Sequence, residues 1–482
     1  KAEEYTGTVT FTLYATTTYE YDPRNLLKKV TDAAGNQTTI GYNGFSRKNT
    51  MTDPNMGSWS YGYSVLGNLT SQTDARTCVT TVTYDDLNRP TGKTYTGAGA
   101  CDTTPDVTYT YDSITGGNEG YGRRTGMTDG SGSSTYLYNV LGQLTNGSQT
   151  IDGTTYSGIA TFDAFDRPLT LTSPSGEVFN FSYNAMGALS SLSGTNTYVS
   201  QVHYNASGQV TDQLLGNGLL EQSCYDANTL RMTKLRVYSG ALQTCGTTPS
   251  SPRLNLSFTY QPNGNVSQMV DATRSETLNY TYDELNRLDT VSGAYSLNHD
   301  YNPIGNITAK GTTTYTYADT AHKHAVTSLN TGESYTYDAN GNMITRVEGG
   351  LTYTQIFDAE NRLISVTVSG QTTQFIYDGD GNLVKKIKPD GSSTTYGRGI
   401  YEVDKNAGGS VTRVVTYYPL GGAMRINSTL YYILKDHLGS ASVVTDASGN
   451  VVGEQRYYPF GETRLTTGSI FTDQLFTGQR EM

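Results

Sequence analysis

The 482-residue chain has a net charge of −11, and no cluster of Lys and Arg is interleaved with aromatic residues. This argues against a nucleic-acid partner, which would need a basic face. No apolar run approaches membrane-spanning length. Only 35% of the residues are hydrophobic, and 39 Tyr outnumber 12 Phe. Because a Tyr ring can pack while its hydroxyl reaches water or backbone, this composition favours a single thin sheet over a thick globular core.

Residues 1–20 are predicted to form one or two strands that lead into a repeat array. The chain begins in mid-pattern at Lys1 without a visible signal peptide, as a mature or excised fragment would. The first residues have the period-two alternation of a half-buried strand, with Thr8, Thr10 and Thr12 alternating against Val9 and Phe11.

A short phrase recurs over residues 21–400. In its clearest copy, residues 336–343, an aromatic residue ends a run of alternating Thr and Tyr, an acid follows, and Gly stands three residues after the acid. Near the start of the chain the aromatic residue recurs every 21 residues. A fixed period of this length is the mark of a repeat architecture. Clear copies carry the pairs Tyr21-Asp22, Tyr84-Asp85, Tyr282-Asp283, Tyr337-Asp338 and Tyr377-Asp378.

The phrase predicts strand, turn and strand. Asp suits the first position of a type I turn, and Gly341 and Gly381 occupy the fourth, where the backbone becomes left-handed. Where Gly is absent, Asn usually replaces it, and Asn also tolerates positive φ. The Asn replacements are Asn25, Asn88, Asn286 and Asn361.

We therefore predict an all-β fold: about 17 hairpin units of roughly 20 residues that form one long antiparallel sheet. Two strands of roughly seven residues a unit give over 30 strands and about 160 Å of ribbon. Accumulated twist must coil such a sheet into a spiral, tube or hollow shell. Only its two ends would then expose strand edges, which are either capped or used for assembly.

The four cysteines fall into two local pairs. Cys78 and Cys101 lie at or just after hairpin tips of successive repeats, so a bridge between them is plausible. Cys224 could pair with Cys245 in the long insertion 239–253, depending on how this loop folds back. Oxidised pairs would indicate a secreted protein; the alternative is four free Cys acting as small hydrophobic residues.

No candidate catalytic, metal or cofactor site passes a motif test. Residues 378–382 are rich in Asp and Gly, but an EF-hand needs Gly and Glu where Leu383 and Pro389 stand. His322 and His324 have no Cys or carboxylate set at ligand spacing and are predicted to be solvated loop residues. Asp436, His437 and Ser440 are triad residue types, yet no Gly-x-Ser-x-Gly motif occurs. We predict no enzyme activity and no cofactor.

The phrase changes in the tail, residues 401–482. Its landmarks are the run 431–440, which contains Asp436-His437-Leu438-Gly439-Ser440, the run 456–462, which contains Pro459-Phe460-Gly461, and the run 476–481. These runs closely resemble the start of the Rhs-associated core of Rhs/YD-repeat proteins. The upstream array resembles the YD repeats of the same family.

The resemblance implies a β-sheet spiral wound into a hollow shell. Similar proteins include bacterial polymorphic toxins, shell-forming components of Tc toxins, and the extracellular part of teneurins. In toxin members the shell encloses a C-terminal toxin, which the core releases by aspartyl autoproteolysis. This chain stops at Met482, before the segment that would carry the cleavage motif and the toxin. The resemblance therefore assigns no protease or payload role to any residue here, and it accounts for Asp436, His437 and Ser440 as a structural signature.

Two functions follow as hypotheses. The first is a non-catalytic scaffold of a secreted or cell-surface protein, forming a shell around its own C-terminal toxin or another cargo. The alternative is an extracellular filament or adhesin, in which neighbouring copies stack end to end and could bind cell-surface glycans. Glycan binding predicts Tyr residues and Trp59 clustered on an outer face, whereas a shell predicts internal rows of Tyr.

Overall fold

The computed structural model describes residues 2–6 and 12–481. Over these ranges the chain forms 43 strands and three short 3-10 helices, with no α-helix, and every strand pairs antiparallel with its neighbours in the sequence. The predicted all-β fold with one antiparallel hairpin sheet is confirmed. The predicted alternation of Thr8 and Thr10 with Val9 and Phe11 lies outside the described residues, as do Lys1 and Met482.

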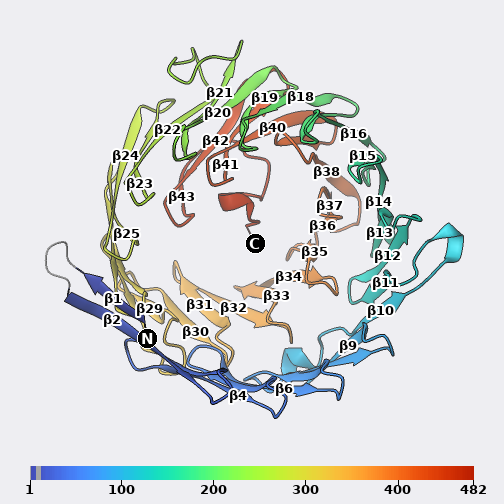
Figure 1. Ribbon diagram of the computed structural model, residues 1–482, viewed down its shortest axis with the longest axis vertical. Coiled ribbons are helices and arrows are strands. Elements are labelled where there is room, and N and C mark those ends of the chain that lie inside the picture. Colours follow the sequence, from blue (N-terminus) through green and yellow to red (C-terminus); the bar gives the residue numbers. More distant parts are fainter. Residues whose placement is uncertain (1, 7–11, 482) are drawn as a thin grey trace.

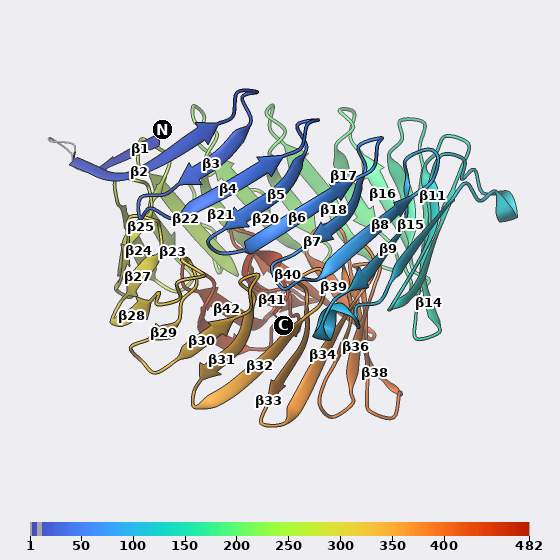
Figure 2. The same ribbon diagram turned by 90° about the horizontal axis from the view of Figure 1, so that it is seen from below.

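The sheet winds into a spiral of two windings (Figures 1 and 2). The first winding ends where the guanidinium of Arg287 lies 5.3 Å from the ring centre of Tyr14. It comprises β1 (Ala2–Thr6), β2 (Thr12–Tyr21), β3 (Leu27–Thr31), β4 (Gln37–Tyr42), β5 (Lys48–Asp53), β6 (Gly57–Tyr63), β7 (Leu69–Thr73), β8 (Val79–Tyr84), β9 (Pro90–Thr96), η1 (Gly99–Cys101), β10 (Val107–Tyr111), η2 (Thr115–Gly117), β11 (Arg124–Asp129), β12 (Gly132–Tyr138), β13 (Leu144–Ile151), β14 (Thr154–Phe162), β15 (Pro168–Thr172), β16 (Val178–Tyr183), β17 (Leu189–Ser193), β18 (Thr197–Tyr204), β19 (Val210–Leu215), β20 (Leu219–Tyr225), β21 (Met232–Ser239), β22 (Leu254–Tyr260), β23 (Val266–Asp271) and β24 (Glu276–Tyr282).

The second winding lies below the first and partly inside it (Figures 1 and 2). It comprises β25 (Leu288–Gly293), β26 (Leu297–Tyr301), β27 (Ile307–Lys310), β28 (Thr313–Thr316), β29 (Ser328–Leu329), β30 (Ser334–Tyr337), β31 (Met343–Glu348), β32 (Leu351–Phe357), β33 (Leu363–Val368), β34 (Gln371–Tyr377), β35 (Leu383–Ile387), β36 (Ser393–Gly397), β37 (Tyr401–Lys405), β38 (Val411–Tyr417), β39 (Ala423–Ile426), β40 (Thr429–Lys435), β41 (Ala441–Asp446), β42 (Val451–Tyr457), β43 (Thr463–Gly468) and η3 (Phe476–Gly478).

The spiral tapers along the chain. Residues that touch across the two windings are 266 positions apart at Asp74 and Asn340 and 180 positions apart at Arg274 and Glu454. The second winding is therefore the smaller one, and Figure 1 shows its last strands, in red, inside the ring of the first.

The turn that ends each unit explains why these residues form hairpins. At the 338–342 turn, the Gly341 N–H donates to Asp338 O at 3.0 Å and the Asp338 N–H donates to Asn342 O at 2.9 Å. The Asp338 carboxylate also accepts from two backbone N–H groups of the turn, those of Asn340 and Asn342, at 2.9 and 3.0 Å. Gly341 has φ +86°, and the register shifts by one residue just before Tyr337. The predicted left-handed fourth position is confirmed.

The Asn replacements behave as predicted. Their φ angles lie between +61° and +64°, at Asn25, Asn88, Asn286 and Asn361. We call these aromatic–acid turns tip turns, and the turns at the opposite ends of the hairpins base turns.

The sheet runs without interruption through the boundary predicted at residue 401, because β37 pairs with both β36 and β38. The three-part division of the chain stays a prediction. Hairpins continue into the tail, which is why the strands outnumber the 30 or so expected from the repeats. At the ends of the sheet, β1 pairs only with β2 and β43 only with β42 within the described residues.

The apolar core is concentrated where the two windings lie face to face. Its largest cluster joins residues of the outer wall, such as Phe179, Leu219 and Leu254, to Tyr432 and Val443 of the inner strands. Elsewhere the buried clusters are small, as expected of a chain with few hydrophobic residues. The described residues contain no helix long and apolar enough to cross a membrane.

Candidate functional site: the seam between the two windings

Tyr residues before the tip turns tie each hairpin to the one before it. The hydroxyl of Tyr84 donates to Leu69 O at 2.9 Å, and that of Tyr377 donates to Leu363 O at 3.0 Å. The same bond recurs from Tyr282 to Val266 O at 3.0 Å. Burial raises the pKa of the Tyr282 and Tyr377 phenols above their ordinary value. The repeated Tyr therefore supplies both packing area and a donor for a carbonyl on the neighbouring hairpin.

Arg residues four positions after the turn acid complete the repeat contact. Arg89 donates from Nε to the carboxylate of Asp85 at 2.7 Å, and its guanidinium lies 4.4 Å from the ring centre of Tyr111 in the next unit. Arg287 makes the same pair of contacts, with Asp283 at 2.6 Å and with the Tyr301 ring at 4.5 Å. The sequence showed Arg at this position, but local turn chemistry did not reveal its contact with the following unit.

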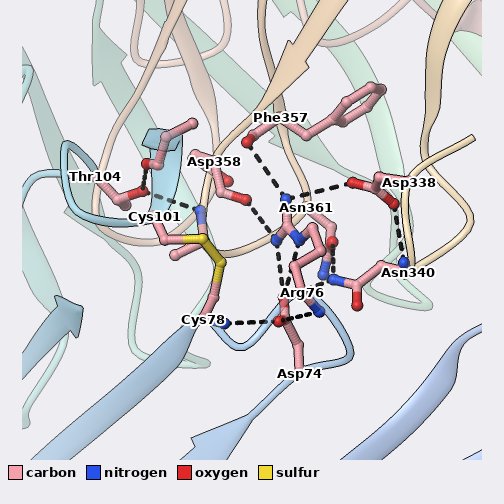
Figure 3. Close-up of a disulfide and its surroundings, with 12 residues drawn as sticks. Asp74, Arg76, Cys78, Cys101, Thr104, Asp338, Asn340, Phe357, Asp358 and Asn361 are labelled. Carbon is pink, nitrogen blue, oxygen red and sulfur yellow. Dashed lines mark hydrogen bonds and ion pairs between the residues drawn. A yellow bond between two sulfur atoms is a disulfide. The ribbon is translucent and has the colours of Figure 1, made fainter. Parts of the chain in front are cut away.

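The seam joins tip turns of the second winding to base turns of the first (Figure 3). The side-chain amide of Asn340 donates to Asp74 Oδ2 at 2.6 Å, and the Ala75 N–H donates back to Asn340 Oδ1 at 3.0 Å. Arg76 donates from Nη2 to both Asp74 Oδ2 and Asp358 O at 2.9 Å. Asp74 is only 4% exposed, so this junction is buried.

The next two tips repeat the arrangement. The Ala359 N–H donates to Thr104 Oγ1 at 2.9 Å, and the carboxylate of Glu360 accepts from Tyr95 at 2.6 Å and pairs with Lys93 at 2.5 Å. One unit later, the Gly379 N–H donates to Asp129 Oδ2 at 2.7 Å.

An ion pair strengthens this last contact. Arg124 of the first winding binds Asp380 with two hydrogen bonds of 2.8 and 2.6 Å. Paired geometry of this kind is among the stronger polar contacts in proteins. Tip turns thus serve as attachment points as well as hairpin ends.

Glycine allows the closest approach at the seam. A Cβ on Gly341 would lie 2.5 Å from Asn55 O, so no larger residue fits without a shift of the backbone. Gly381 has φ +89° but nothing near it, so only its backbone conformation favours glycine. The predicted repeat residues therefore differ in role: Gly341 is part of the seam and Gly381 is not.

The tip turns of the first winding form an open rim with large apolar residues. Val65 is 99% exposed and Phe165 is 79% exposed. At the third turn position, where first-winding tips carry large apolar residues such as Phe165, the second-winding tips of the seam carry the polar residues Asn340, Glu360 and Asp380. The exposed apolar residues of the rim are Phe45, Val65, Leu66, Leu87, Val140, Leu141, Phe165 and Met186.

The structure pairs the four cysteines as Cys78 with Cys101 and Cys224 with Cys245, at Cα separations of 5.5 and 6.0 Å. Both separations suit a disulfide. The first pair is buried beside Ala359 at the seam (Figure 3). The second anchors the insertion between β21 and β22. Oxidation of both pairs in solution stays a prediction.

The tail signature forms two further tip turns. The Ser440 N–H donates to Asp436 Oδ1 at 2.8 Å, and Gly439 has φ +84°. The Ser440 hydroxyl oxygen accepts from the Thr477 N–H at 3.1 Å, while the His437 ring packs against Phe258 at 4.5 Å. Within the described chain, His437 makes no hydrogen bond to Asp436 or Ser440, so these residue types are not arranged as a triad.

The second signature turn, at Pro459-Phe460-Gly461, receives the C-terminal segment. A Cβ on Gly461 would lie 2.6 Å from the ring of Phe476, which also packs against Tyr457 at 5.5 Å. Phe460 is half exposed beside His299. The signature residues thus hold the last residues of the chain inside the ring (Figure 1).

His322 and Trp59 are both buried. His322 is 5% exposed and its Nδ1 lies 2.7 Å from Asp319 Oδ2, so the prediction of a solvated loop residue is wrong. The His324 N–H binds Asn55 of the first winding, 269 positions away, and holds the loop against it, whereas the His324 side chain is exposed, as predicted. Trp59, predicted to be on an outer face if the protein binds glycans, is 8% exposed and donates to Met56 O.

Among the described residues, no three His, Cys, Asp or Glu side chains are placed to hold a metal ion.

The array and tail also match known families of sequence. The family described as Teneurin YD-shell matches residues 243–472, and the RHS Repeat family matches residues 21–55 and 58–100. The chain belongs to the Rhs/YD-repeat family.

Two curated Rhs/YD-repeat relatives show how the match is distributed. The toxin subunit YenC1 of Yersinia entomophaga is 23% identical over 386 residues, which cover 63% of this chain and 39% of YenC1. The tRNA3(Ser)-specific nuclease WapA of Bacillus spizizenii is 26% identical over 224 residues, or 43% of this chain and 8% of WapA. This YD-repeat chain therefore spans only a minor part of each relative.

Solved structures share the fold of the YD-repeat shell. A crystal structure of TcdB2-TccC3-Cdc42 superposes with a TM-score of 0.84 at 17% identity and covers 99% of this chain and 28% of the other. The Photorhabdus luminescens Tc holotoxin pore superposes with a TM-score of 0.82 at 17% identity, again over 99% and 28% of the two chains. The described chain therefore has the fold of a shell-type YD-repeat scaffold.

Proposed function

We propose that this chain is part of the wall of a hollow shell that encloses a C-terminal toxin or other cargo polypeptide. The observation that carries the proposal is the seam, in which successive tip turns bind base turns 250 to 282 positions earlier in the chain. Such contacts join the second winding to the first, as a closed wall requires.

Two further observations support an enclosure. The last strands and η3 lie inside the ring, where a polypeptide continuing from them would begin (Figure 1). Relatives include a toxin subunit and a Tc holotoxin pore. A toxin container is a secreted or cell-surface protein, and the two local Cys pairs fit an oxidising compartment.

Protease protection tests the enclosure. A flexible reporter peptide is fused after the last residue of the full chain, and a matched control carries the same reporter before the first residue. We expect slower cleavage of the C-terminal reporter than of the N-terminal one, with the fold intact in both. Equal cleavage rates would overturn the enclosure.

The second candidate is a filament built from neighbouring copies, and the open rim favours it. A row of exposed apolar tips is a feature that monomeric proteins rarely leave uncovered. Electron microscopy of the purified chain at several concentrations separates the two candidates. Discrete hollow particles of constant size support the shell, whereas long filaments with an axial repeat support end-to-end assembly. A role in glycan binding receives no support from Trp59, because this side chain is buried.

A further inference from the structure

The tip turn that follows Gly379 in the second winding departs from the repeat chemistry. It consists of residues 398–400, between β36 and β37, and Arg398 occupies it with φ +55°. Long L-residues rarely adopt this left-handed conformation, which Gly, Asn and Asp tolerate best. An outlier of this kind persists only where the surrounding structure holds it, and it often marks a functional position.

The wall opposite Arg398 is shaped to receive its side chain. Gly147 and Gly158 are cross-strand partners in β13 and β14 of the first winding. A Cβ on Gly147 would lie 2.2 Å from Nη2 of Arg398, and one on Gly158 would lie 3.6 Å from its Nε. Gly weakens a strand interior and often marks close approach by another group. Two paired glycines and a strained arginine therefore meet at one point.

The guanidinium of Arg398 makes no hydrogen bond or ion pair with any residue in the described ranges. Two other arginines of this part of the seam are paired: Arg124 binds Asp380, and Arg480 binds Glu402 and Asp473. Burial lowers the pKa of Arg398 below its ordinary value, as expected for a cation without a carboxylate partner. Because a partly buried charge without a partner is unfavourable, the unpaired guanidinium of Arg398 indicates a position that a bound anion could complete.

Arg398 lines a cavity of about 610 Å³ between the two windings. The polar side chains of Ser134, Tyr136 and Gln149 lie on the same lining. Two carboxylates also line it, but Asp380 is held by Arg124, and Asp378 accepts from the Asn382 side chain at 3.1 Å. The N–H groups of Arg398 are thus the uncommitted charged donors of the cavity among the described residues.

We propose that Arg398 is the anchor of an oxyanion-binding site and takes a carboxylate or a phosphate in this cavity. A planar guanidinium matches both groups with two parallel hydrogen bonds. The oxyanion could come from a free small anion or from an acidic side chain of a polypeptide inside the ring. The site does not depend on the proposed enclosure, because its residues all belong to the described chain.

Calorimetric titration of the full chain tests the site with three probes: inorganic phosphate, acetate, and the blocked amino acid N-acetyl-glutamate amide. We expect saturable binding with one site per chain. Arg398→Gln should weaken binding at least about tenfold, since it removes a charge-assisted pair of hydrogen bonds. Arg398→Lys keeps the charge but loses the planar pair of donors, so its affinity should lie between those of the wild type and Arg398→Gln. Arg24→Gln on the open rim is the matched control and should leave binding unchanged.

Chemical labelling of the wild-type chain provides a measurement that does not depend on a variant folding. Phenylglyoxal modifies accessible arginines, and a bound oxyanion should slow its reaction at Arg398 but not at Arg24. Binding of phosphate and acetate supports a site for free anions, whereas binding of the blocked glutamate alone supports a polypeptide source. No saturable binding with any probe, together with equal labelling of Arg398 with and without anions, would overturn the proposal.

Discussion

One hydroxyl distinguishes Tyr from Phe at the position before each tip turn, and the repeat uses it as a donor. Tyr377 donates to Leu363 O at 3.0 Å, so Tyr377→Phe should lower the free energy of unfolding by about 0.5–1.5 kcal/mol. Urea denaturation measures this change. Tyr353→Phe is the control, because the Tyr353 hydroxyl makes no hydrogen bond within the described chain and its loss should change little. Equal effects of the two substitutions would contradict the role of the hydroxyl.

At the same scale, Glu360 should make the seam sensitive to acid. Burial alone would raise the pKa of its carboxyl, but hydrogen bonds from Lys93 and Tyr95 outweigh burial and lower the pKa below 4.5. A depressed folded-state pKa contributes stability that is present above the unfolded value and is lost as the pH falls through the folded one. Stability should therefore fall between about pH 5 and pH 3.

The variant Glu360→Gln isolates this effect. Its free energy of unfolding should depend less on pH over that interval than the wild-type value, because one linked proton is removed. Urea denaturation at a series of pH values measures the slope, and Asp86→Asn, at an exposed first-winding tip, is the control. An unchanged slope in Glu360→Gln would show that the acid sensitivity lies elsewhere.

At the scale of elements, a comparison of two arginines in similar turns, one at the seam and one on the rim, tests the contribution of the seam. Arg76 and Arg24 each bind the Asp two positions earlier, but only Arg76 also reaches across to the second winding at Asp358 O. Arg76→Ala should lower the free energy of unfolding by about 1–3 kcal/mol, since it leaves buried acceptors without a donor. Arg24→Ala should have little effect, because exposed pairs contribute little.

Hydrogen exchange of the backbone amides locates the effect. In Arg76→Ala the amides of the 338–342 and 358–362 turns should lose protection, while those of first-winding tips should not. A loss of protection spread evenly over the sheet would contradict a local role for the seam.

The cysteine pairs act between neighbouring hairpins, so their contribution also belongs to this scale. Their sequence separations are 23 and 21 residues. Closing loops of this length should stabilise the chain by about 2–4 kcal/mol each. Peptide mapping without reduction should recover Cys78 linked to Cys101 and Cys224 linked to Cys245, and reducing agent should lower the Tm. Free thiols at all four positions would contradict the prediction.

Local chemistry explains which parts of the fold could be predicted. The Asp338 turn and the alternation before it depend on residues within five positions, so strands, turns and the coiled sheet followed from the sequence. The contact of Asn340 with Asp74 spans 266 positions, so the local turn chemistry of neither residue predicts it. The burial of His322 could not be predicted either, because its loop lies against Asn55, which is far away in the sequence. The sequence does carry one signal: at the third turn position the second-winding tips have Asn340 and Glu360, where the first winding has large apolar residues such as Phe45 and Phe165.

At the scale of the whole molecule, the open rim should govern association. Replacing the exposed tip residues Val65, Leu66 and Phe165 by Ser removes apolar surface without touching a buried contact. If copies associate through the rim, the wild-type chain should become larger with concentration in analytical ultracentrifugation, and the triple variant should stay monomeric. A wild-type chain that is monomeric at every concentration would contradict association between copies through this surface.

The taper of the spiral has a consequence for how the chain finds its final arrangement. In a cylinder of identical units, one winding could slide along the other by one hairpin and still match every tip to some base turn. Here the spacing between partners shrinks from 266 to 180 positions, so a slip by one unit would misplace all the contacts by different amounts. The two windings can therefore match all their contacts in one register only. A repetitive sequence thereby specifies a single assembled state.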